Sequence, residues 1–176
     1  MRILELLEKN FFIIASIAHL SVILVTIKGY KDNSKLFYLI GHLLIYSAMA
    51  IRIMKKYRGK LYPSISGSIG HTLLLVYFIR SLVTQKKSGM DQLITIICIL
   101  GQIGMVMVYW SEYIESNTNT DDEEQEYIKL NKMISFLLLL IFYSYGIFVN
   151  NGILYMIVNI IVSFAYLTAF LKAKTE

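Results

Sequence analysis

The chain contains long stretches of apolar residues separated by short polar segments, and this pattern predicts transmembrane helices. A spanning helix needs about 20 mostly apolar residues at ~1.5 Å of rise per residue. The last apolar stretch, Met133 to Leu171, runs for 39 residues without a charge, which is too long for one span. Asn150, Asn151 and Gly152 interrupt it, because Asn and Gly accept turn conformations. Six spans are therefore expected, near residues 10–27, 36–54, 61–84, 92–111, 133–149 and 153–171.

Composition agrees with a membrane-embedded fold. Hydrophobic residues make up 56% of the chain, charged residues 16%, and the mean hydropathy is +0.59. A soluble domain carries about a quarter charged residues. Cys98 is the single cysteine, which excludes a disulfide scaffold. The predicted fold class is all-α, a single integral membrane domain (residues 1–176) of six transmembrane helices built from helical hairpin repeats.

The distribution of positive charge predicts the orientation. With six spans both termini lie on one side, and eleven of the 17 Lys and Arg residues fall on that side. Because Lys and Arg concentrate in cytoplasmic loops, both termini are expected in the cytoplasm of a multi-pass protein of the cell inner membrane. The basic residues lie between apolar runs rather than in one patch, so nucleic acid is not an expected partner.

The longest predicted connection is an acidic loop at residues 112–132, which holds seven of the twelve Asp and Glu residues. We interpret it as a solvated cytoplasmic linker with a helical end. A docking role, either for a partner protein or within a homo-oligomer, is the alternative. On the same side, a set of basic residues is predicted to anchor the protein or bind lipid head groups: Arg52, Lys55, Lys56 and Arg58.

Short sequence matches suggest an internal repeat of helical hairpins. Residues 16–20 (Ser-Ile-Ala-His-Leu) match residues 68–72 (Ser-Ile-Gly-His-Thr), and Gly41-His42 matches Gly101-Gln102. Tyr109 follows Gln102 by seven residues, as Tyr166 follows Asn159. These features are similar to those of PQ-loop and SWEET-like membrane proteins. The stretch Leu36–Ile114 resembles the three-helix membrane domain of lipid-A-disaccharide synthase N-terminal type, and the resemblance implies a transport fold.

Polar residues recur at one depth in the predicted helices. At ~1.5 Å per residue, three histidines and Gln102 lie about 14–15 Å from a helix end, near the middle of a ~30 Å hydrocarbon layer. Lipid cannot satisfy these groups, so they should face inward. They predict either a solute site at the midplane or hydrogen bonds that hold helices together. The candidate substrate-binding residues are His19, His42, His71, Gln102, Asn159, Tyr109 and Tyr166.

The leading functional hypothesis is a small-solute membrane transporter with a midplane polar site between helix repeats, in contact with lipid and with a small polar solute. The first alternative is a non-transporting sensor or partner subunit, associated with signalling, lipid binding or defence. The second is a haem protein with His42 and His71 as the axial pair. We expect no enzyme activity, catalytic residue, metal or cofactor. A water-filled midplane cavity favours a carrier, and a dry, packed core favours the first alternative.

Overall fold

The computed structural model describes residues 2–29, 35–54, 57, 60–85, 88–118, 121–149 and 152–175, and side chains from residue 10 to residue 174 within these ranges. This part of the chain forms an all-α fold. Its six helices are α1 (Arg2–Lys28), α2 (Leu36–Arg52), α3 (Leu61–Thr84), α4 (Gly89–Glu115), α5 (Asp122–Val149) and α6 (Ile153–Thr175). The predicted fold class is therefore confirmed.

The helices have the length and composition of membrane spans, with one shorter member. Within the described ranges, all helices except α2 are long and apolar enough to cross a membrane, which makes five candidate spans. α2 has 17 residues, about 25 Å at ~1.5 Å per residue. The chain is a multi-pass helical membrane protein, and the length of α2 lies at the lower limit for a spanning helix.

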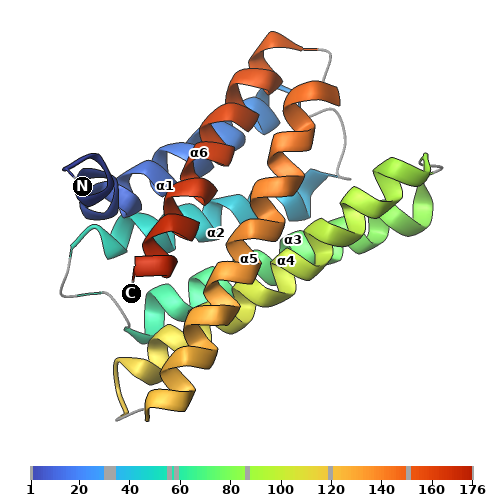
Figure 1. Cartoon of the computed structure of the whole chain (residues 1–176). Coiled ribbons are helices and arrows are strands. Elements are labelled where there is room, and N and C mark those ends of the chain that lie inside the picture. Colours follow the sequence, from blue (N-terminus) through green and yellow to red (C-terminus); the bar gives the residue numbers. More distant parts are fainter. Residues whose placement is uncertain are drawn as a thin grey trace.

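The six helices form a closed ring. Each helix packs mainly against its neighbours in the chain, and α1 also packs against α6. Because consecutive helices run in opposite directions, both termini and the α2–α3 and α4–α5 connections lie at one end of the bundle (Figure 1). We call this the termini end. The other three connections lie at the opposite, distal end.

α2 and α3 cross closely at two glycines. A Cβ on Gly41 would stand 2.9 Å from the carbonyl oxygen of Gly70, and a Cβ on Gly70 would stand 2.8 Å from that of Gly41. Backbone therefore meets backbone, which only glycine permits at this distance. The residue after each glycine is a histidine, so this crossing brings His42 and His71 into the same layer of the bundle.

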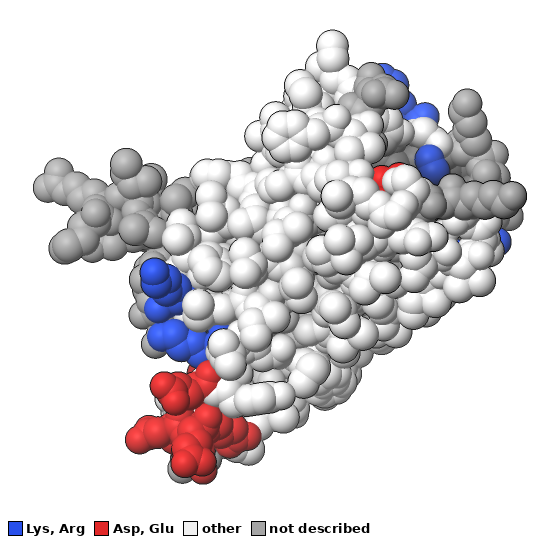
Figure 2. Space-filling view, turned by 45° about the vertical axis from the view of Figure 1, so that its right-hand side comes forward, with Lys and Arg blue, Asp and Glu red and all other residues white. Residues whose placement is uncertain are grey.

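The outer surface has the character of a lipid-facing belt. Exposed apolar side chains follow the outer faces of the helices, among them Leu24, Ile69, Leu100 and Ile134. Figure 2 shows a broad face without charge, with an acidic cluster at one end and basic side chains near both ends. On this face the charge of the described residues is thus confined to the two ends, as expected for a protein whose middle lies in hydrocarbon.

The acidic segment differs from the predicted loop at residues 112–132. α4 continues to Glu115 and α5 begins at Asp122, so the segment is mostly helical. Asp121 caps α5: its Oδ1 accepts a hydrogen bond of 2.8 Å from the backbone N–H of Glu124. Acidic residues also favour the first turn of a helix, where the dipole is positive. Hydropathy locates the part of a helix that lies in lipid, and it misses such polar extensions.

Candidate functional site

Four buried polar side chains from four helices form one layer across the middle of the bundle. His19 on α1 and His42 on α2 approach with Nδ1 to Nδ1 at 2.9 Å. His71 on α3 and Gln102 on α4 are joined by a hydrogen bond of 2.6 Å between Nδ1 and Oε1. All four side chains are at most 5% exposed. We call these residues the midplane layer.

The two contacts of the midplane layer are equivalent in the first two hairpins. In each hairpin a histidine of the odd-numbered helix pairs with the polar residue that follows a glycine in the even-numbered helix. In the third hairpin, the amide of Asn159 packs against Gly146 on α5, where a Cβ would stand 2.7 Å from Nδ2. The hairpin repeat inferred from short sequence matches thus has a counterpart in side-chain contacts.

Hydrogen-bonding capacity in the midplane layer is only partly used. Because Gln102 Oε1 can only accept, His71 donates from Nδ1 and its Nε2 is left as an acceptor. Among the residues that the structure describes, the Nε2 atoms of His42 and His71 have no hydrogen-bond partner, and neither does the hydroxyl of Tyr109. Such buried atoms cost free energy, so the packed layer is not the best-satisfied arrangement of these groups.

The layer is closely packed. Beside His19 and His71 lies a void of about 20 Å³, lined by residues from all six helices, including Met49, Met105 and Phe136. This is about the room that one water molecule needs. In this conformation the void has no room for a solute, and it is too small for a porphyrin beside His71.

A much larger pocket opens at the distal end. This distal pocket has a volume of about 500 Å³ and is also lined by residues from all six helices. A volume of this size is typical of small-molecule sites. Since every helix contributes to both the void and the distal pocket, both lie on the axis of the ring. The polar side chains in the wall of the distal pocket are Thr26, Lys35, Tyr38, Tyr77, Gln85, Asp91, Thr95, Tyr145, Tyr155 and Asn159.

Aromatic rings connect the distal pocket to the midplane layer. Tyr38 stands edge-on to His42, with ring centroids 4.5 Å apart, and contacts Tyr77 at 4.9 Å. Phe78 continues this cluster, with its ring centroid 5.2 Å from that of Tyr77 and 5.1 Å from that of Phe142. These rings form the floor of the distal pocket, so a ligand on that floor would lie one side chain away from the polar layer.

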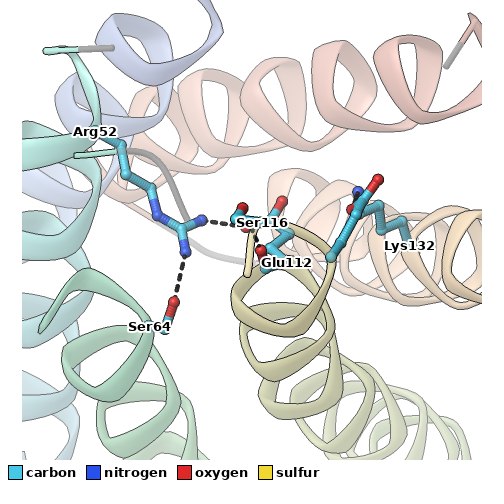
Figure 3. Close-up of polar contacts among 6 residues, drawn as sticks. Arg52, Ser64, Glu112, Ser116 and Lys132 are labelled. Carbon is cyan, nitrogen blue, oxygen red and sulfur yellow. Dashed lines mark hydrogen bonds and ion pairs between the residues drawn. The ribbon is translucent and has the colours of Figure 1, made fainter. Parts of the chain in front are cut away.

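An ion-pair network lies at the termini end. The guanidinium of Arg52 pairs with the carboxylate of Glu112, and its Nη2 also contacts Ser64 Oγ at 3.5 Å (Figure 3). Lys132 Nζ lies 3.5 Å from a carboxylate oxygen of Glu115. These contacts tie α2 to α3 and α4, and α4 to α5. They border a second pocket of about 510 Å³, which we call the termini-side pocket.

The predicted site residues separate into distinct environments. Tyr109 is buried between His71, at a centroid distance of 5.5 Å, and the guanidinium of Arg52, which lies 4.4 Å from its ring centroid. Tyr166 lines the midplane void. Asn159 lies in the distal pocket, outside the midplane layer. Arg52 is 3% exposed and points inward rather than to a head-group surface. Lys55, Lys56 and Arg58 lie outside the described residues.

The charged residues of the distal pocket, Lys35 and Asp91, are not among the predicted site residues. Asp91 lies in the first turn of α4, where Ser88 Oγ accepts a hydrogen bond from its backbone N–H. The Ser88 cap is a readable signal for the helix start. No feature of the sequence places either residue beside the other five helices. Within the described part of the chain, no group of three or more His, Cys, Asp or Glu is placed to hold a metal ion.

Comparisons with protein-family models, with curated proteins and with solved structures give no match.

Proposed function

We propose that this protein is a small-solute carrier whose pathway follows the axis of the six-helix ring. The observation that carries the proposal is the axial order of three features. The distal pocket and the midplane void are both lined by all six helices, and the aromatic floor of the pocket and the midplane layer lie between them. Sites at the interface of helix repeats are typical of transporters.

The chemistry of the midplane layer supports a barrier that opens. Its imidazole and amide groups carry hydrogen-bond donors and acceptors, and two of its nitrogen atoms have no partner among the described residues. A conformation with water or a solute among these groups would satisfy them and would offset part of the cost of separating the helices. The layer contains no carboxylate or ammonium, so it favours solutes without net charge.

The ion pairs at the termini end fit the same scheme as the closed gate of the pathway. Arg52 with Glu112 and Lys132 with Glu115 hold the ends of α2, α4 and α5 together while the distal pocket is open. In the alternative conformation these contacts would separate and the distal aromatic rings would close. This scheme requires the midplane layer to become accessible to water.

The single cysteine tests that requirement without knowledge of the solute. Cys98 is fully buried, and its Sγ lies 3.8 Å from Gln102 Nε2 in the midplane layer. In the reconstituted protein, a small charged thiol reagent in the aqueous phase should modify Cys98 at a measurable rate if the barrier opens. Two reporters in a Cys98→Ser background calibrate the rate. Asn159→Cys should react quickly from the distal pocket, and Leu100→Cys, which faces lipid, should not react.

Modification of Cys98 at a rate between the two reporters supports the carrier. A rate equal to that of Leu100→Cys in the folded protein, with full reaction after denaturation, overturns it.

A non-transporting membrane protein is the second candidate, and the packing of the midplane favours it. His42, His71 and Gln102 are 0% exposed, and the adjoining void holds about one water. For such a protein the polar pairs hold the helices together, the distal pocket is a ligand sensor, and Cys98 stays unreactive. The same labelling experiment therefore separates the two candidates.

A further inference from the structure

The first contact of the midplane layer joins two side chains that can each gain a proton. Nδ1 of His19 and Nδ1 of His42 lie 2.9 Å apart, so one nitrogen donates and the other accepts. We call these two residues the histidine pair. In the second contact of the layer, His71 meets Gln102, whose amide oxygen accepts but does not titrate. An amide at position 42 could therefore hold the first contact as well, and the second imidazole adds a capacity that packing does not require.

The histidine pair can take up one proton without losing its contact. Two neutral imidazoles carry two N–H groups on four ring nitrogens, and one of these N–H groups lies between the rings. The ring that donates it has a bare Nε2. A proton from water that binds there gives an imidazolium whose Nδ1–H still donates to the neutral partner, and the contact becomes a stronger, charge-assisted hydrogen bond. A second proton would put an N–H on both Nδ1 atoms, so the pair can hold one.

The hydrogen bond also lets the proton pass from one ring to the other. When the Nδ1 proton crosses the 2.9 Å contact, the positive charge moves to the second imidazole, which can release its own Nε2 proton to water. One proton enters and one leaves, and the pair is neutral again with its tautomers exchanged. Nε2 of His42 has no hydrogen-bond partner among the described residues, so no structural bond of that part of the chain occupies it. The contact between His71 and Gln102 offers no such transfer, because the amide does not titrate.

The histidine pair lies between the two cavities on the axis of the ring. His42 stands edge-on to Tyr38, which lines the distal pocket, with ring centroids 4.5 Å apart. His19 lines the midplane void. A proton that passes from His42 to His19 therefore moves from the distal pocket toward the void. Both residues belong to the α1–α2 hairpin, so the hairpins can separate without breaking the contact.

The groups that face the histidine pair provide no negative charge. Its titratable neighbours are Tyr38 on α2, His71 on α3 and, across the midplane void, Tyr166 on α6. Arg52 adds a positive charge that acts on His71. A proton on the pair has no counter-charge among these groups, and a buried, unpaired charge is costly. The packed layer therefore favours the neutral pair, and the protonated pair favours a conformation that water reaches.

We propose that the histidine pair is a proton-binding site and that the proton is the coupling ion of the carrier. One proton binds to the pair when the layer opens toward water, and its release allows the layer to pack again. By linkage, acid then shifts the population toward the open conformation. The coupling role rests on the proposed function, whereas proton binding by the pair does not require transport.

Nitrogen NMR of the histidine-labelled full chain in lipid nanodiscs tests the site, with the proton itself as the probe. The chain has three histidines, so the signals are few. On acidification from about pH 8 to about pH 5, the signals of His19 and His42 should shift together, because one proton is shared between two rings. The spin coupling across the Nδ1–Nδ1 hydrogen bond should persist. A response of one ring alone, no response in the folded protein, or loss of the coupling on protonation overturns the proposal.

The pH dependence of Cys98 labelling tests the link between the proton and the opening of the layer. Expressed relative to the Asn159→Cys reporter at each pH, the rate should rise at least about tenfold between about pH 8 and about pH 6. The occupancy of an unsaturated proton site rises about tenfold per pH unit. A normalised rate of Cys98 labelling that does not change with pH overturns the coupling role.

Matched variants assign the response to the histidine pair. The double variant His19→Gln with His42→Gln replaces the pair by two amides, which can still bond to each other but cannot take up a proton. It should remain folded and lose the rise in Cys98 labelling. His71→Gln makes the same change in the second contact and should retain the rise. If His71→Gln loses the rise and the double variant keeps it, the coupling proton is not on the pair.

Proton binding and transport fail independently in these experiments. A shared proton on the histidine pair with unreactive Cys98 would leave the proton site standing and overturn the carrier. Reactive Cys98 with a pair that stays neutral would leave the carrier standing and overturn the proton site.

Discussion

Among single residues, we expect substitutions in the midplane layer to change the free energy of unfolding most. Each is a polar group in the part of a membrane protein where water is scarce, and each obtains one hydrogen bond from a residue on another helix. Removal of one partner leaves the other without compensation, which costs more than the bond itself was worth. The stability of a double variant that removes both partners of a pair is therefore the informative measurement.

Gln102→Leu should lower the thermal midpoint of the protein in detergent, because it leaves His71 without its hydrogen bond at Nδ1. The cost of an orphaned buried group is about 1–3 kcal/mol, whereas an interhelical bond in a membrane protein averages about 0.6 kcal/mol. The double variant with His71→Leu removes both polar groups and should recover most of the loss. Additive losses in the double variant would show that the pair is not coupled.

Gly67 provides a second residue-scale prediction. A Cβ at this position would overlap the ring of Tyr109, which is fixed between His71 and Arg52. Gly67→Ala should therefore destabilise the protein by about 1–3 kcal/mol, the usual cost of overpacking.

The matched control is Gly89→Ala. A Cβ at Gly89 meets nothing within 4 Å, so this variant should be neutral or slightly stabilising in the same unfolding assay. Adding Tyr109→Ala to Gly67→Ala should make the losses less than additive. Equal stability of the Gly67 and Gly89 variants would contradict the close contact.

Among the elements, α5 departs most from the sequence-based expectation. Its first turns are acidic and extend past the apolar stretch, and Asp121 provides the cap. Asp121→Ala should raise the hydrogen-exchange rates of the amides at the start of α5, since loss of an N-cap costs about 1 kcal/mol. Glu123→Ala changes the charge without touching the cap and should have a smaller effect. Equal exchange in both variants would show that the cap does not hold this turn.

The features of the structure that the sequence predicted are those that its signals, hydropathy and depth along a helix, can measure. Hydropathy located the apolar part of every helix. The rise per residue placed His19, His42, His71 and Gln102 at one depth. Both signals can be read within a single helix, without knowledge of its neighbours. The starts of α4 and α5 were missed because hydropathy does not register the polar first turns, which Ser88 and Asp121 cap. The resemblance to PQ-loop and SWEET-like proteins stays a prediction.

The sequence could not predict contacts between distant segments, for a different reason. Arg52 was expected at a lipid surface because it follows an apolar run. Its ion-pair partner Glu112 lies 60 positions further along the chain. The distal pocket similarly requires all six helices to meet, and no local pattern encodes that meeting. No sequence signal predicts the inward direction of Arg52 or the presence of Lys35 and Asp91 in one pocket.

At the scale of the whole molecule, the ring constrains how the protein sits in the bilayer. α2 is short, yet it packs along both α1 and α3, which are long enough to cross. An antiparallel ring of six helices places both termini at one end (Figure 1). If α2 lay at one surface without crossing, α1 and α3 would have to cross in opposite directions, whereas in the ring they run in the same direction.

We therefore expect reporters fused before Met1 and after Glu176 to report the same side of the membrane, and one inserted at Gly152 to report the other. The excess of Lys and Arg at the termini end further predicts that the shared side is the cytoplasm. Local thinning of the bilayer around α2, at about 25 Å of helix against ~30 Å of hydrocarbon, is a modest cost. Protease protection of intact vesicles provides an independent measurement. Termini on opposite sides would show that α2 does not cross, and that the ring opens in the membrane.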